Sequence, residues 1–104
     1  MSVISITFHT VESENHKWDL FVENDLPQLV DNLFEVEKYI LSEVDSEMIM
    51  EGKNTNLLLV FQDEEKREDF RQIELKNITE IVEKKFGENV MVFTTLLNPL
   101  KINL

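Results

Sequence analysis

Side chains able to do chemistry are few in this sequence of 104 residues. It contains two histidines, one tyrosine, one tryptophan and no cysteine. The lack of cysteine excludes a disulfide framework, a thiol nucleophile, an iron–sulfur cluster and a thiolate zinc site. His9 and His16 lie on different predicted elements, with no His-x-x-x-His or Asp-x-Asp spacing beside them, so no metal site is expected. The sequence also lacks a glycine-rich phosphate loop and a nucleophile motif, and no cofactor is predicted.

Four polar residues are candidates for lining a cavity: Ser5, Thr7, His9 and Tyr39. The first three alternate with apolar residues, which places them on one face of a predicted first strand. His9 could contact a ligand or act as a general base there, or it could be a solvated histidine near a strand end. Tyr39 shares a predicted strand face with Leu41, where it could line the mouth of the cavity or cover a sheet edge.

Asp25 and Trp18 lie on the apolar stripe of the first predicted helix. A carboxyl group buried in such a stripe could act as an acid. Asp25 also stands two positions before Pro27 in Asp-Leu-Pro-Gln, a pattern typical of a capping box, and we favour this structural role. Trp18 is expected to be part of the core.

Apolar spacing predicts two helices, both of them interrupted. The first, which Ser13 is expected to cap, is broken at Pro27, so we expect two helical pieces with a bend between them. The second begins at an Asp63 cap and runs to Phe86. Its apolar stripe changes phase near residues 73–76, which predicts a kink or break there.

Alternation and short apolar runs predict four strands, over residues 2–11, 35–44, 57–61 and 90–97. The element order is therefore strand–helix–strand–strand–helix–strand. Right-handed crossovers then give a single α+β, ferredoxin-like βαββαβ domain over residues 1–104. We expect one antiparallel sheet in the order 4-1-3-2, with both bent helices on one of its faces.

Two helices can cover only one side of this sheet, yet the sequence places large apolar residues on both sides. Leaving them in water would cost about 1.5–3 kcal/mol each relative to burial. A second copy of the chain, packed sheet against sheet, would cover them, so we expect a homodimer. The predicted interface residues are Leu58, Val60, Met91, Phe93, Met48, Met50 and Ile102.

The charge balance excludes several partners. A net charge of −11 opposes binding to nucleic acid and to anionic membrane surfaces. RNA-binding proteins of similar element order need basic and aromatic residues on the central strands, and residues 57–61 contain no basic residue. No signal-peptide pattern and no membrane-length apolar stretch is present, so a cytoplasmic protein is expected. The acidic clusters are interpreted as solvated surface, and Asp63–Arg67 as an ordinary helix pair.

Several short motifs resemble those of a family of short bacterial proteins of unknown function. They are Trp18 followed by Asp25-Leu26-Pro27, then Phe86-Gly87, and a closing strand with Phe-Thr-Thr-Leu-Leu at residues 93–97. That family is similar in fold to the dimeric α+β barrels, which include the antibiotic-biosynthesis-type monooxygenases. The resemblance implies a homodimeric barrel. Members often have His-Ile-Pro where this chain has Asp25-Leu26-Pro27, so a role of that imidazole is not carried over.

Three classes of function remain open. A non-catalytic homodimeric binding or assembly module is favoured, because convergent polar residues are scarce. The alternative is a small-molecule-binding enzyme of the cofactor-free monooxygenase type, with a cavity between the sheets, which rests on analogy of fold. An amino-acid-sensing regulatory domain has the same element order, but it is expected within a longer chain. The sequence alone predicts no reaction.

Overall fold

The computed structural model describes residues 1–33, 35–45 and 52–103. Its strands are β1 (Ser2–Thr10), β2 (Lys38–Glu43), β3 (Lys53–Phe61) and β4 (Val90–Leu97). Its α-helices are α1 (Asn15–Leu20), α2 (Leu26–Asp31), α3 (Glu64–Gln72) and α4 (Glu74–Phe86). The strands pair antiparallel in the order β2-β3-β1-β4, which confirms the ferredoxin-like α+β fold and the predicted strand order.

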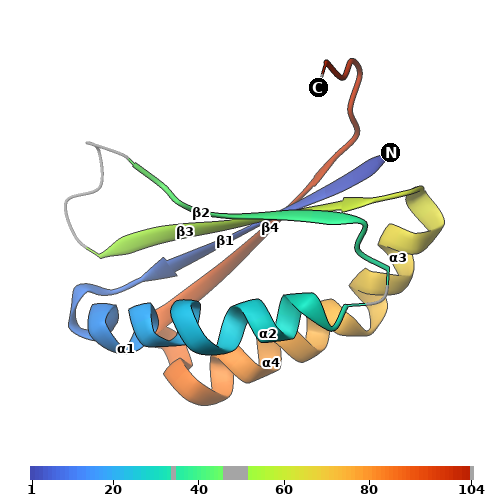
Figure 1. The fold of residues 1–104 in the computed structure, drawn as a ribbon. Coiled ribbons are helices and arrows are strands. Elements are labelled where there is room, and N and C mark those ends of the chain that lie inside the picture. Colours follow the sequence, from blue (N-terminus) through green and yellow to red (C-terminus); the bar gives the residue numbers. More distant parts are fainter. Residues whose placement is uncertain (34, 46–51, 104) are drawn as a thin grey trace.

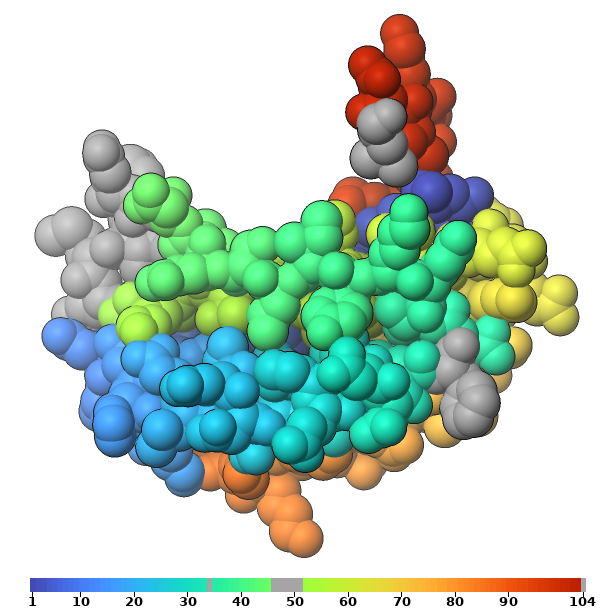
Figure 2. All heavy atoms as spheres, in the orientation of Figure 1, coloured from blue at the N-terminus to red at the C-terminus, as the bar shows by residue number. Residues whose placement is uncertain are grey.

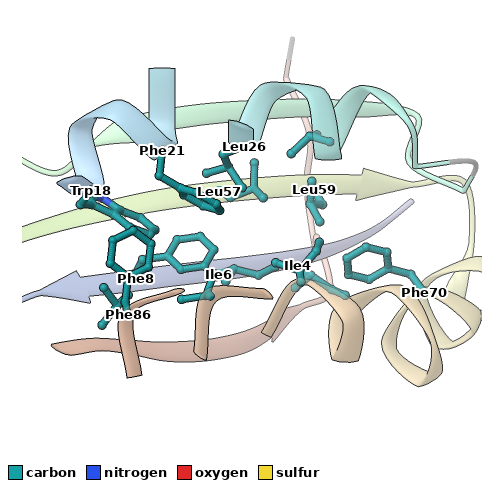
Figure 3. Packing of buried hydrophobic residues seen from close by; sticks show 14 of the residues in the cluster. Ile4, Ile6, Phe8, Trp18, Phe21, Leu26, Leu57, Leu59, Phe70 and Phe86 are labelled. Carbon is teal, nitrogen blue, oxygen red and sulfur yellow. The ribbon is translucent and has the colours of Figure 1, made fainter. Parts of the chain in front are cut away.

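The helices lie together on one face of the sheet, and no described helix covers the other face (Figure 1). The core fills the space between the sheet and the helices (Figure 3). Alternate residues of β1 and β3 point into it and are fully buried: Ile4, Ile6, Phe8, Leu57, Leu59 and Phe61. Trp18 is also fully buried, and its ring lies within 5.5 Å of the rings of Phe8, Phe21 and Phe86, measured between centroids. The prediction that Trp18 belongs to the core is confirmed.

The first helical region is continuous, and a π-helical segment at Phe21–Asp25 joins α1 to α2. Pro27 lies in the first turn of α2. A proline ring clashes with the carbonyl one turn earlier, and the wider π turn relieves that clash without ending the helix. The predicted capping box at Asp25 is therefore wrong: its side chain makes no cap hydrogen bond, and its Oδ2 accepts instead from Lys85 Nζ at 2.8 Å.

The start of this region also differs from the prediction. A 3₁₀ turn at Glu12–Glu14 precedes α1, so Ser13 lies inside the turn and is not the cap. The N-cap position of the turn is Val11, whose side chain has no polar atom to donate or accept a hydrogen bond. The helical backbone therefore begins at Glu12, before Ser13, although Ser13 is the better capping residue by type.

The second helical region confirms two predictions. Asp63 caps α3, since its Oδ1 accepts from the backbone N–H of Lys66 at 2.9 Å. The chain breaks at Ile73, which separates α3 from α4 at the predicted change of phase. The predicted Asp63–Arg67 surface pair is wrong, because Arg67 is buried and its guanidinium is directed into the sheet. There Arg67 Nη1 donates to the Leu97 carbonyl at 3.1 Å.

Two strands differ from their predicted lengths. β2 begins at Lys38 rather than at residue 35, and β3 begins at Lys53 rather than at residue 57. The longer β3 pairs along its whole length with β1, from Lys53 opposite Thr10 to Phe61 opposite Ser2. This extension brings two asparagines, Asn54 and Asn56, into the sheet.

A candidate ligand- and partner-binding face

The side of the sheet away from the helices, called here the open face, is defined by the strand register. Residues directly opposite one another in antiparallel strands point to the same side. The open face therefore presents Val3, Ser5, Thr7 and His9 of β1, Asn54, Asn56, Leu58 and Val60 of β3, Met91, Phe93, Thr95 and Leu97 of β4, and Lys38, Ile40 and Ser42 of β2. This surface lies between the C-terminal tail and the end of β2 (Figure 2).

Much of the open face is apolar. Ile40 is 59% exposed, Phe93 54%, Met91 48% and Leu97 42%. These side chains lie on the two edge strands, and they flank the half-buried Leu58 and Val60 of β3. Apolar patches of this kind on one face of a protein typically mark an interaction site.

Much of the middle of the open face is polar. Five residues of β1 and β3, called here the polar strip, form two hydrogen-bonded groups: Ser5, Thr7 and Asn56, and His9 and Asn54. Asn56 Nδ2 donates to Ser5 Oγ at 2.8 Å and to Thr7 Oγ1 at 3.2 Å. His9 Nδ1 lies 2.6 Å from Asn54 Oδ1. All five residues are half-buried.

The His9–Asn54 contact indicates the tautomer of a neutral imidazole at this position. An amide oxygen only accepts, so Nδ1 of His9 is the protonated nitrogen, and in the neutral ring Nε2 keeps a free lone pair. His9 can thus accept a proton or a hydrogen bond at Nε2 while Asn54 holds the ring. Across the described ranges, no group of three His, Cys, Asp or Glu residues could hold a metal ion.

The structure brings together most of the predicted site. Ser5, Thr7 and His9 lie side by side along β1. The predicted interface residues Leu58, Val60, Met91 and Phe93 lie on the same open face, whereas Met48 and Met50 lie outside the described residues.

Tyr39 does not join this set. It pairs with the buried Leu59, so it points to the helix side of the sheet. Its hydroxyl donates to Asp31 Oδ1 of α2 at 2.9 Å, and this hydrogen bond links the edge strand β2 to α2. The hydrogen bond to the Asp31 carboxylate raises the pKa of Tyr39, and desolvation and the negative charge of Asp31 add to this effect.

Ile102 lies in the C-terminal tail that follows β4. The tail rises on the open side of the sheet, opposite the described helices (Figures 1 and 2). Leu100 is fully exposed and Ile102 is 47% exposed, so two apolar side chains of the tail are in water. The tail starts beside Arg67, whose Nη1 donates to Asn98 Oδ1 at 2.9 Å.

A comparison with protein families decides the family of the chain. The family described as "Domain of unknown function (DUF4286)" matches residues 1–100. The chain belongs to the DUF4286 family. No curated protein matches this DUF4286 sequence.

Solved structures similar to this DUF4286 protein share its fold at low sequence identity. An ethyl tert-butyl ether (EthD) family protein from Bacillus halodurans has a TM-score of 0.69 and 15% identity, covering 91% of this chain and 97% of its own. A dimeric ferredoxin-like protein from an uncultured marine organism has a TM-score of 0.68 and 13% identity, covering 100% and 99%. A proposed antibiotic biosynthesis monooxygenase from Deinococcus radiodurans has a TM-score of 0.69 and 12% identity, covering 100% and 98%. These likenesses establish a ferredoxin-like fold.

A search of the described residues of the DUF4286 chain found no helix with the length and apolar character needed to cross a bilayer.

Sequence reasoning missed two members of the polar strip, Asn54 and Asn56. Their signal was present, since both alternate with Thr55 and Leu57 in the same period of two as the rest of β3. The continuous apolar run from Leu57 concealed the polar start of the strand.

Proposed function

We propose that this DUF4286 protein acts as a homodimer in which two open faces meet, and that the dimer is a non-catalytic binding or assembly module. The observation that carries this proposal is the exposure of Ile40, Phe93, Met91 and Leu97 on a face that none of the described helices covers. Covering each such side chain contributes about 1.5–3 kcal/mol. The fold is also that of a solved protein described as a dimeric ferredoxin-like protein.

The size of the open face suits a dimer. Four strands about 4.8 Å apart and about eight residues long make a flat surface of roughly 20 by 25 Å, or about 500 Å² on each protomer. Protruding side chains add to this area, so two such surfaces approach the area of stable protein interfaces, about 1,200–2,000 Å² in total.

The charge distribution also favours a second copy as the partner. The chain has a net charge of −11, yet Lys38 is the one charged residue among the described strand residues of the open face. Two copies therefore meet there without opposing acidic side chains. Like charges placed together would instead weaken the association.

The C-terminal tail extends the proposed interface. Leu100 and Ile102 belong to the tail that follows β4, and this tail rises on the open side of the sheet (Figure 2). Both side chains are exposed to water. In the dimer the partner's sheet occupies that side, so the tail packs along the partner and Ile102 contacts it. Arg67 holds the start of the tail through Asn98.

Sedimentation velocity across a range of concentrations tests the dimer. We expect wild-type protein to sediment as a dimer and Phe93→Asp to sediment as a monomer. Two charged side chains per dimer replace two buried rings, so the dissociation constant should rise by at least about 100-fold. The matched control is Ile73→Asp, which changes a 65% exposed apolar residue at the junction of the two helices. A wild-type monomer at every concentration, or equal dissociation of both variants, contradicts the proposal.

The alternative function is a small-molecule-binding enzyme of the cofactor-free monooxygenase type. Nε2 of His9, left free by the bond from Nδ1 to Asn54, is the observation that favours it. Oxygen uptake by the dimer in the presence of electron-rich phenols is the assay. Uptake that is lost in His9→Gln and kept in the control His16→Gln supports the enzyme, and no uptake by wild-type protein supports the binding module.

A further inference from the structure

The open face departs from the usual interface pattern. Protein interfaces generally have an apolar centre and a polar rim. Here five of the eight open-face residues of β1 and β3, the two central strands, form the polar strip, and the other three are Val3, Leu58 and Val60. The most exposed apolar side chains of the face, Ile40, Met91, Phe93 and Leu97, lie on the edge strands. A face selected for dimerisation alone would place its apolar residues at the centre.

The polar strip still has unused hydrogen-bonding capacity. Its internal bonds use Nδ1 of His9, Oδ1 of Asn54 and Nδ2 of Asn56. Within the part of the chain that the structure describes, the remaining groups make no hydrogen bond to another side chain of the open face. They include the hydroxyl hydrogens of Ser5 and Thr7, Nδ2 of Asn54, Oδ1 of Asn56 and Nε2 of His9. Burying these donors and acceptors between two sheets without partners would cost about 1–3 kcal/mol each.

We propose that the dimer encloses the polar strip in a chamber that binds an uncharged ring compound carrying amide or hydroxyl groups. This inference rests on the proposed dimer. Such a compound satisfies the donors and acceptors of the strip, and its ring packs against Phe93 and Met91, which lie directly opposite Thr7 and His9 on β4. The ligand is uncharged because the described strip and its β4 neighbours contain no Asp, Glu, Lys or Arg side chain, and the neutral His9 ring presents a lone pair at Nε2. A buried ion would lack a counter-charge there.

Three ring compounds of similar size separate the charge states. Benzamide is neutral, benzoate is an anion and benzylamine is a cation. We expect benzamide to shift the NMR signals of the Asn54 and Asn56 side-chain amides and of the His9 ring, and to bind at least about tenfold more tightly than either ion. Equal binding of all three, binding elsewhere, or no binding by benzamide overturns the chamber.

A substitution in the strip gives an independent measurement. In Asn56→Leu, an apolar side chain of similar size replaces an amide on both protomers. If the strip serves a ligand, this change weakens benzamide binding at least tenfold and tightens the dimer by about tenfold or more, because two further apolar groups become buried. Thr7→Val is the second variant and should act in the same direction. A weaker dimer in both variants would show that the strip bonds across the interface instead, and would overturn the proposal.

The two proposals fail in different ways. If wild-type protein is monomeric, the dimer fails first. If wild-type protein is dimeric but the strip variants only loosen it, or benzamide leaves the strip unchanged, the chamber fails and the dimer stands.

Discussion

Replacing Arg67 with methionine should strongly destabilise the fold, although Arg67 looks like an ordinary helix-surface residue in the sequence. The side chain is only 7% exposed. From α3 its Nη1 reaches the backbone carbonyls of Val3 at 3.3 Å and Leu97 at 3.1 Å, and Asn98 Oδ1 at 2.9 Å. One guanidinium thus connects a helix to the ends of two neighbouring strands. Methionine keeps most of the aliphatic stem and removes the donors.

The expected loss follows from these contacts. Nη1 carries two hydrogens, so the two shorter contacts count as full bonds and the contact with Val3 as a shared one. Hydrogen bonds from a charged donor contribute about 1.5–3 kcal/mol each, or roughly 3–6 kcal/mol for two. Part of this lost free energy is recovered, because the substitution also removes the cost of burying the guanidinium charge. We expect a net loss of about 2–4 kcal/mol in the free energy of unfolding.

Urea unfolding, followed by the fluorescence of Trp18 at one fixed protein concentration, measures this loss. Trp18 is the single tryptophan and is fully buried, so it reports on the core. The control is Arg71→Met on the same helix, where Arg71 is paired at 2.9 Å with Glu68 on the surface. Such pairs contribute less than about 1 kcal/mol. If the two variants lose the same small amount, the bonds of Arg67 do not hold the strand ends and the reasoning is refuted.

Two further predictions concern a turn and a hydroxyl group. Both Gly52 and Gly87 have positive φ, 79° and 58°, but a Cβ at Gly52 would also collide with the Thr10 carbonyl oxygen, whereas a Cβ at Gly87 would meet nothing. Gly52→Ala should therefore lower the urea midpoint clearly more than Gly87→Ala, and equal effects would show that φ alone matters. The Tyr39 phenol should titrate above its ordinary value of about 10, as near-ultraviolet absorbance would show, and Asp31→Asn should lower that midpoint. Because the pKa of Tyr39 is higher in the folded protein than in the unfolded chain, the Tyr39–Asp31 hydrogen bond stabilises the fold fully below the unfolded pKa. This stabilisation is lost as the pH rises through the folded pKa. A titration midpoint that Asp31→Asn leaves unchanged would contradict the role of Asp31.

The fold could be predicted from the sequence because its signals are local. The alternation of Ile4, Ile6 and Phe8 identified β1 and its buried side, and the phase change at Ile73 identified the break between α3 and α4. The capping prediction was correct at Asp63 and wrong at Asp25. The latter failed because a π-helical segment accommodates a proline without a new helix start, and residue types alone do not distinguish these two solutions.

The sequence by itself determined that large apolar residues lie on both sides of the sheet, and therefore that one apolar sheet face would lack a cover. It also placed Ser5, Thr7 and His9 together, since a period of two puts alternate residues on one side. Only the tertiary structure decided which residues lie beside them. Asn54 and Asn56 come from more than 40 residues along the chain, and the antiparallel register of β1 with β3 brings them within hydrogen-bonding distance. That register depends on how the whole core packs, so the alternation within one strand does not predict which residues of the neighbouring strand lie opposite it.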